Sequence, residues 1–151
     1  MNNKTTPENI KLILSNISLP KGFYIREFKE NDFSYIQKIY ETEGWLTIIK
    51  RPNDALKAFK NSDIVLVIIY EDNIVGVLRG LTDTEITTYI IELIINKNFR
   101  GKSLGKALIN ACHLLYPKTR IELLGSNSSK DFYKANEFRD FFGFRKSFKN
   151  D

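Results

Sequence analysis

The feature of this sequence that most constrains the fold is a series of three apolar runs separated by short polar turns. β-branched and aliphatic residues, which favour extended strands, dominate positions 64–70, 74–81 and 86–95. Turns of only a few residues join consecutive strands in antiparallel order. Apolar residues within 104–115 then recur with the period of an amphipathic helix, and a further buried strand is predicted at 120–124. A strand that follows its neighbour through a crossover helix runs parallel to it.

The remaining elements complete a mixed α/β (α+β) fold. Alternating apolar and polar residues predict a strand at 23–28, and two helices are expected from Phe33 and from Pro52 onward. The phenylalanine-rich stretch 141–148 predicts an edge strand that closes the sheet. We therefore expect a central, mostly antiparallel sheet with one parallel β–α–β step, flanked by helices.

Two further helices carry start signals in the sequence. Thr6-Pro7-Glu8 predicts a short N-terminal helix that extends to about Ile17, and Ser128 with Asp131 forms a capping-box pattern for a helix at 129–138. We interpret residues 1–22 as an N-terminal extension and residues 23–151 as a single domain.

Composition excludes several classes of protein. The chain has 151 residues, 42% of them hydrophobic, which lets one domain bury a core without metals or disulfides. Cys112 and His113 are the single cysteine and the single histidine, so neither a metal site nor an internal disulfide is expected. No stretch resembles a membrane span or a secretory signal, which predicts a soluble, cytoplasmic protein.

A glycine-containing turn before the 104–115 helix forms a candidate anion site. It reads Arg100-Gly101-Lys102-Ser103-Leu104-Gly105-Lys106. The first N–H groups of a helix lack intrahelical acceptors and lie at the positive end of its dipole, so they attract anions. The spacing excludes a nucleotide-triphosphate loop, because the two glycines enclose three residues rather than four and Ala107 follows Lys106. It also lacks the glycine triplet of dinucleotide sites.

This turn resembles the pyrophosphate-binding motif of the GNAT acetyltransferases, Gln/Arg-x-x-Gly-x-Gly/Ala, with Arg100, Ser103 and Gly105 at the matching positions. The order of elements from position 23 onward is similar to that of the superfamily, and the segment 132–138 is similar to its Phe-Tyr-x-x-x-Gly-Phe pattern. Ser103 and Glu137 each stand where the family has glycine. The chain is thus identified as resembling a small, single-domain GNAT protein of bacterial type.

The resemblance implies acetyl-CoA as co-substrate and indicates which residues hold it. The strand end at 93–95 is implied to pair with the pantetheine arm, and the turn and helix start are implied to bind the pyrophosphate. The implied cofactor-binding residues are Leu93, Ile94, Ile95, Arg100, Gly101, Lys102, Ser103, Leu104, Gly105, Lys106 and Asn127. Asn127 could instead cap the following helix.

Two residues are candidates for catalysis. By resemblance, Tyr133 is the acid that protonates the departing thiolate; the alternative is that it only packs its helix against the sheet. Glu92 is the candidate general base, directly or through water, because an apolar strand disfavours the charged form of a carboxylic acid. The alternative for Glu92 is a solvent-facing strand position.

The hypothesis that follows is an N-acetyltransferase that acts on a primary amine of an unidentified small molecule or peptide. A catalytically silent acetyl-CoA-binding or interaction module is the alternative, since Ser103 and Glu137 depart from the family pattern. A nucleic-acid-binding domain is disfavoured despite the net charge of +5, because basic and aromatic residues do not alternate as on a single-strand platform. The apolar C-terminal strand predicts a homodimer.

Overall fold

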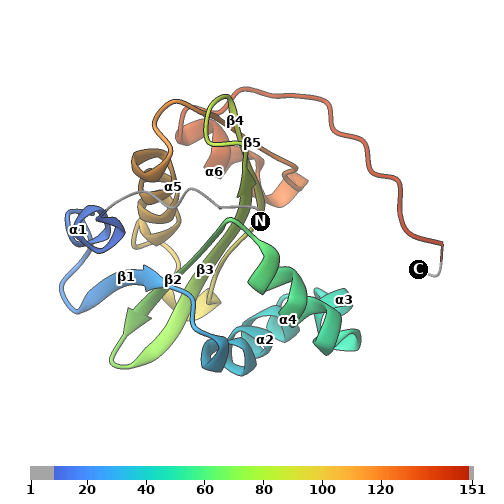
Figure 1. Ribbon diagram of the computed structural model, residues 1–151, viewed down its shortest axis with the longest axis horizontal. Helices are drawn as coiled ribbons and strands as arrows, with labels where there is room; N and C mark the ends of the chain where they lie inside the picture. The colour runs from blue at the N-terminus through green and yellow to red at the C-terminus, as the bar shows by residue number, and fades with distance from the viewer. Residues whose placement is uncertain (1–8, 150–151) are drawn as a thin grey trace.

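A five-stranded sheet, with its strands in sequence order, forms the centre of the computed structural model, which describes residues 9–149 (Figure 1). The strands are β1 (Phe23–Glu27), β2 (Ile64–Tyr70), β3 (Asn73–Thr82), β4 (Thr87–Ile95) and β5 (Arg120–Leu123). Strands β1 to β4 pair antiparallel, and β5 joins β4 in parallel. The predicted mixed sheet with one parallel step is therefore confirmed.

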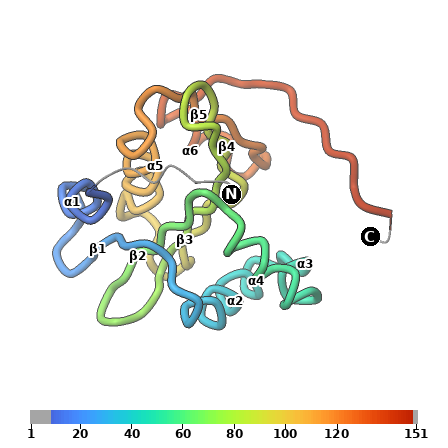
Figure 2. Tube along the Cα trace, viewed as in Figure 1, coloured from blue at the N-terminus to red at the C-terminus, as the bar shows by residue number. Residues whose placement is uncertain are grey.

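Helices cover both faces of this sheet (Figures 1 and 2). The helices are α1 (Ile10–Ser15), α2 (Phe33–Thr42), α3 (Leu46–Lys50), α4 (Pro52–Asn61), α5 (Leu104–Leu115) and α6 (Lys130–Ala135). In the core, α1 and α5 share one cluster with Leu66 and Ile68 of β2, whereas α2 and α4 share the other with Val67 and Ile69. Because β2 is buried on both faces, its sequence is a continuous apolar run.

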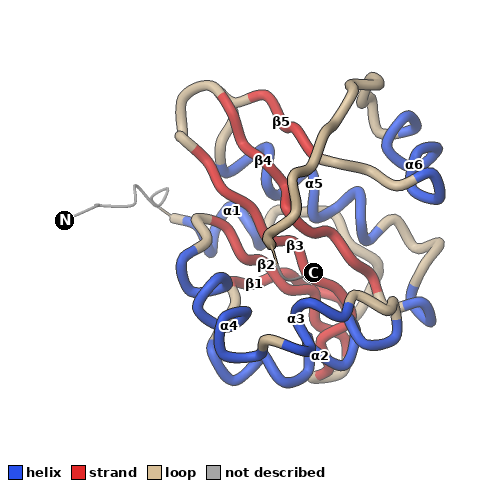
Figure 3. Tube along the Cα trace, turned by 90° about the vertical axis from the view of Figure 1, so that its right-hand side faces the viewer, coloured by secondary structure: helices blue, strands red, loops and turns tan. Residues whose placement is uncertain are grey.

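Strand β4 changes its pairing halfway along its length. On the β3 side, Arg79 faces Glu92 and Gly80 faces Ile90, so Ile91 is the extra residue of a β-bulge. On the β5 side, pairing ends at Ile90 opposite Leu123. Figure 3 shows the chain leaving β5 as a loop that leads to α6. In the described part of the chain, the second half of β4 therefore has no strand partner on this side.

The predicted edge strand at 141–148 is wrong. This segment is an extended tail in which Phe142 and Phe144 are 97% and 94% exposed, and Figure 1 shows it running away from the sheet. A strand needs a neighbouring edge as well as an apolar composition. The available edge, β5, is only four residues long, and the chain turns away from it through α6.

The terminal helices also differ from the predicted ones. The described helix α1 begins at Ile10, and the signal at Thr6-Pro7-Glu8 lies outside the described residues. Helix α6 ends at Ala135 rather than at Phe138. The predicted capping box of Ser128 with Asp131 is wrong. A short 3-10 turn, η3 (Asn127–Ser129), precedes the helix, and the capping box joins Ser126 and Ser129 at the start of this turn. Among the described residues, no helix has the length and apolar character needed to cross a membrane.

Candidate active site

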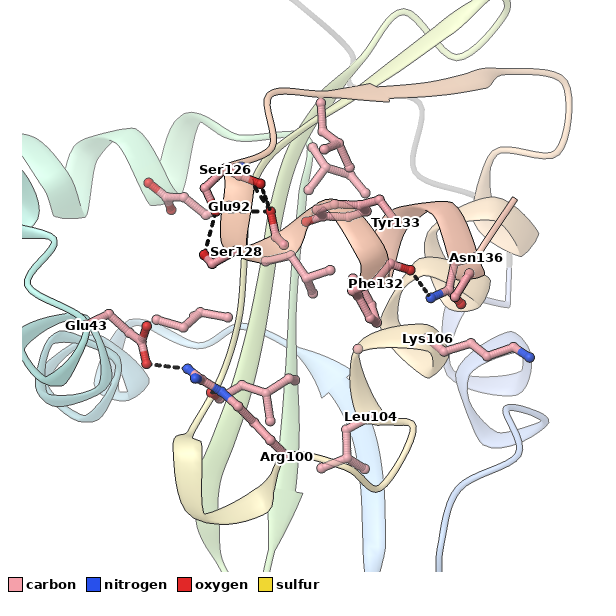
Figure 4. A pocket seen from close by; sticks show the side chains of 18 of the residues that line it. Glu43, Glu92, Arg100, Leu104, Lys106, Ser126, Ser128, Phe132, Tyr133 and Asn136 are labelled. Atoms are coloured by element: carbon pink, nitrogen blue, oxygen red, sulfur yellow. Dashed lines mark hydrogen bonds and ion pairs between the residues drawn. The ribbon is translucent and has the colours of Figure 1, made fainter. Parts of the chain in front are cut away.

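A cavity of about 750 Å³ lies where β4 and β5 separate (Figure 4). The second half of β4, the loop after β5, the start of α5 and helix α6 surround it, and the end of α2 lies on its other side. Most of the predicted site residues line this cavity, namely Glu92, Leu93, Ile94, Ile95, Arg100, Gly101, Ser103, Leu104, Gly105, Lys106 and Tyr133. Of the predicted set, Lys102 and Asn127 are exposed and lie outside the lining.

The N-terminus of α5 makes one end of the cavity attractive to anions. Ser103 is the N-cap residue, and its side chain makes no capping hydrogen bond, so the first N–H groups of this 12-residue helix stay available to a ligand. At Gly101 (φ 77°) an added Cβ would meet nothing within 4 Å. A bulky anion can therefore approach the backbone, and these residues fit the pyrophosphate of a CoA thioester.

Arg100 links this anion end to α2. Its Nε donates to the carbonyl oxygen of Ile95 at 3.0 Å, and its Nη2 forms an ion pair with Glu43. Figure 4 shows Glu43 and Arg100 facing each other at the side of the cavity near α2. The guanidinium of the predicted phosphate motif is thus held by a carboxylate of the opposite wall.

The C-terminus of α2 presents Glu43 and Trp45 to the cavity. Backbone hydrogen bonds run from Trp45 N–H to the Tyr40 carbonyl and from Gly44 N–H to the Glu41 carbonyl, each at 3.1 Å. With Gly44 at φ 72° this is a Schellman motif. The rings of Trp45 and Tyr40, whose centroids are 5.4 Å apart, provide its hydrophobic contact. The motif fixes where Glu43 and Trp45 lie.

Glu92 is held by three charged or polar donors. Its Oε2 accepts from the Tyr40 hydroxyl at 2.6 Å and from Arg79 Nε at 2.9 Å, and its Oε1 accepts from Arg79 Nη2 at 2.9 Å. The Arg79 and Glu92 side chains are only 12% and 13% exposed, so the solvent-facing alternative for Glu92 is wrong. Glu92 stabilises the region behind Trp45, and its role as a base stays a prediction.

Tyr133 lies on the opposite side of β4 from the partners of Glu92. Figure 4 shows the Glu92 carboxylate directed away from Tyr133, whose ring extends from α6 into the cavity. The Tyr133 ring packs edge-on against Phe132 and Phe138, with centroids 5.1 and 5.4 Å apart. Burial raises the pKa of Tyr133 above its usual value of 10.0, so the phenol is protonated at neutral pH and can donate. The cavity connects this phenol with the α2 side.

The predicted set of site residues contained none from the end of α2 and none of the serines that follow β5. Glu43, Trp45, Ser128, Ser129 and Asn136 also line the cavity. The Arg100–Glu43 pair joins residues 57 positions apart, and no local pattern contains such a contact. The one usable signal was Gly44, because a glycine just after a helix favours a Schellman motif that fixes its neighbours.

The two departures from the family glycines share a backbone conformation. Ser103 (φ 59°) and Glu137 (φ 69°) both occupy the left-handed region. At Glu137 the bonds from Phe138 N–H to the Tyr133 carbonyl and from Glu137 N–H to the Lys134 carbonyl repeat the Schellman motif of α2. A glycine is therefore suited to each position for backbone reasons alone.

We expect Glu137→Gly to stabilise the protein by about 1 kcal/mol, because a side chain in the left-handed region costs about 1–2 kcal/mol, partly offset by the greater freedom of glycine in the unfolded chain. Ser103→Gly should also stabilise the protein. Urea denaturation measures both. The matched control is Gly44→Glu in the equivalent motif of α2, where a side chain meets no neighbour and should destabilise by a similar amount. Equal stabilities for Glu137→Gly and the wild type would contradict the argument.

The site thus combines a parted sheet, a helix N-terminus that attracts anions and a protonated phenol beside one cavity. The family model described as "Acetyltransferase (GNAT) domain" matches residues 61–140, which is more than half of the chain. The chain therefore belongs to the GNAT acetyltransferase family and is an acyltransferase enzyme, as its sequence predicted.

Individual relatives agree with this family. An uncharacterized N-acetyltransferase, ycf52, of Pyropia yezoensis is 28% identical over 78% of this chain and 71% of its own length. A GNAT-family acetyltransferase from Streptococcus pneumoniae has a similar fold, with a TM-score of 0.67 at 17% identity over 85% of this chain and 98% of that one. An aminoglycoside acetyltransferase from an uncultured soil metagenomic sample has a TM-score of 0.63 at 19% identity, over 85% of this chain and 97% of that one. The structural matches support the fold alone.

Proposed function

We propose that this enzyme transfers the acetyl group of acetyl-CoA directly to a primary amine of a small molecule or peptide. The observation that carries the proposal is the polarity of the cavity. Its α5 end offers unpaired helix N–H groups to an anion, its α2 end carries Glu43, and Tyr133 lies on the wall between β4 and α6. An anionic acyl donor and an amine acceptor suit these two ends.

In the proposed reaction each residue has one task. Acetyl-CoA supplies the acetyl group as a thioester, whose C–S bond breaks as the C–N bond to the neutral amine forms. The start of α5 binds the pyrophosphate, and the unpaired half of β4, from Leu93 to Ile95, binds the pantetheine arm. The Tyr133 phenol donates its proton to the departing sulfur. Glu92 accepts the amine proton through water and releases it to solvent, and solvent returns a proton to the Tyr133 phenolate, so that both groups recover their starting state.

Calorimetric titration with acetyl-CoA tests the first half of this proposal, with coenzyme A and ATP as comparisons. We expect micromolar binding of both CoA compounds and weaker binding of ATP. Ser103→Asp should weaken acetyl-CoA at least about tenfold, because a carboxylate then faces the phosphates at short range. Its fold should be unharmed, since aspartate tolerates the left-handed region and is a favoured N-cap.

Ser103→Asn is the matched control for this experiment. It has nearly the same shape as Ser103→Asp but no charge, and should keep the affinity for acetyl-CoA within about threefold of the wild type. Equal weakening in both variants would mean that shape at the turn, not phosphate binding, decides the result. If the wild type binds no CoA compound, the proposed function is wrong and the silent interaction module takes its place.

Two further proposals concern the setting of this activity. We propose a cytoplasmic location, as expected from the sequence. We also propose a homodimer in which the tail at 139–149 covers a second copy, since Phe141, Phe142 and Phe144 are 75%, 97% and 94% exposed and each can bury about 150–250 Å² there. A monomeric mass by light scattering across concentrations contradicts the dimer.

A further inference from the structure

We propose that Glu43 and Trp45 form the acceptor subsite, that this subsite selects an amine with a second cationic group, and that Arg100 covers it until the cofactor binds. The inference rests on the proposed acetyl transfer and extends it to the class of acceptor. Its basis is the ion pair between Arg100 and Glu43 across the cavity wall.

The subsite is rigid because a chain of contacts supports it. The Schellman motif at the end of α2 holds both residues, and the Trp45 ring rests on Tyr40, which is fully buried and donates to Glu92. Trp45 is nevertheless 41% exposed and lines the cavity. The indole thus packs on Tyr40 with one part and is exposed to the cavity with another, and tryptophan is the preferred aromatic partner of an organic cation.

The local charges also favour a cation here. Two carboxylates line the cavity, Glu43 and Glu92. Glu92 is neutralised by the paired bonds from Arg79, whereas the partner of Glu43 is Arg100, which belongs to the phosphate motif. The carbonyl end of the 10-residue helix α2 adds its negative dipole at the same place.

The chemistry of the transfer then narrows the acceptor. An amine must be neutral to attack a thioester, so the reacting nitrogen cannot remain the ionic partner of Glu43 during the reaction. If Glu43 is to stabilise the transition state, the acceptor needs a second amino group that stays protonated while the first one reacts. Diamines, polyamines and amino sugars have this chemistry, and simple monoamines do not.

Arg100 couples the two ligands. When its guanidinium turns to a phosphate of the cofactor, Glu43 loses its partner and becomes available to the acceptor. Without cofactor, the Arg100–Glu43 pair occupies the subsite. We therefore expect ordered binding, with the acyl donor first.

The experiment measures amine binding by calorimetry with coenzyme A present, so that no turnover occurs. The probes are 1,4-diaminobutane, spermidine and 2-deoxystreptamine, with butylamine and cyclohexylamine as monoamine counterparts. The wild type should bind at least one of the first three about tenfold or more tightly than its counterparts, and only when coenzyme A is present. Glu43→Gln should remove this preference, whereas Glu41→Gln, on the exposed face of α2, should keep it.

Arg100→Gln tests the coupling separately. This variant should bind coenzyme A more weakly but bind the preferred amine even without coenzyme A, because Glu43 then has no ion pair with Arg100. A wild type that binds coenzyme A yet treats monoamines and diamines alike overturns the inference and leaves the proposed function intact. A Glu43→Gln variant that still prefers diamines to monoamines but loses turnover with every amine also overturns the inference, because Glu43 would then act as a base. A wild type without affinity for coenzyme A overturns the proposed function itself.

Discussion

Replacing Tyr133 by phenylalanine is expected to lower turnover about 100-fold or more, while the Kd for acetyl-CoA stays within about twofold of the wild type. The change removes one hydroxyl group and keeps the ring that packs between Phe132 and Phe138. Because burial raises the pKa of Tyr133, the phenol stays protonated at neutral pH, and its loss removes the donor to the departing sulfur. Steady-state kinetics and calorimetry on the same samples separate the two effects.

The control for this experiment is Tyr35→Phe, which removes an exposed hydroxyl on α2 that does not line the cavity. It should leave both turnover and Kd unchanged. If Tyr133→Phe keeps wild-type turnover, Tyr133 only packs α6 against the sheet, which is the alternative that the sequence left open. A drop in turnover matched by an equal loss of acetyl-CoA affinity would indicate a damaged binding site rather than a missing acid.

The parts of this protein that its sequence predicted are those set by local patterns. The run of β-branched residues at Ile64–Tyr70 and the helical spacing within Leu104–Leu115 each define an element without reference to the rest of the chain. The turn from Arg100 to Gly105 also carries its chemistry locally, because a helix start and its unpaired N–H groups lie within one short segment. The sequence therefore suffices to predict an anion site at this turn, and its occupancy by a phosphate stays a prediction.

The parts that the sequence did not predict depend on contacts between distant segments. Glu43 meets Arg100 only because the end of α2 and the turn before α5 border the same cavity. Glu92 is enclosed because Tyr40 and Arg79 converge on it from two other elements. The 141–148 tail failed as a strand for the same reason, since its apolar pattern says nothing about which edge is free. Local periodicity predicts elements, and tertiary packing decides which side chains meet.

Replacing Arg79 by methionine is expected to lower the free energy of unfolding by about 3–5 kcal/mol. The variant leaves the Glu92 carboxylate, 13% exposed, without its counter-ion, and it also removes the contact of the guanidinium with the Phe59 ring at 5.1 Å. Lys60→Met is the control, because it breaks an exposed ion pair with Glu30 and should cost less than about 0.5 kcal/mol. Urea denaturation measures all variants on one scale.

Adding Glu92→Gln to Arg79→Met separates charge from packing. The amide oxygen still accepts from the Tyr40 hydroxyl, so the double variant should recover more than half of the loss if an unpaired carboxylate causes it. Equal instability of the single and double variants would assign the loss to packing against Phe59.

Glu92→Gln alone then decides the role of this residue in catalysis. A fall in turnover much larger than its effect on stability supports Glu92 as the base, whereas unchanged turnover means that Glu92 positions Tyr40 and Trp45 and that solvent takes the amine proton.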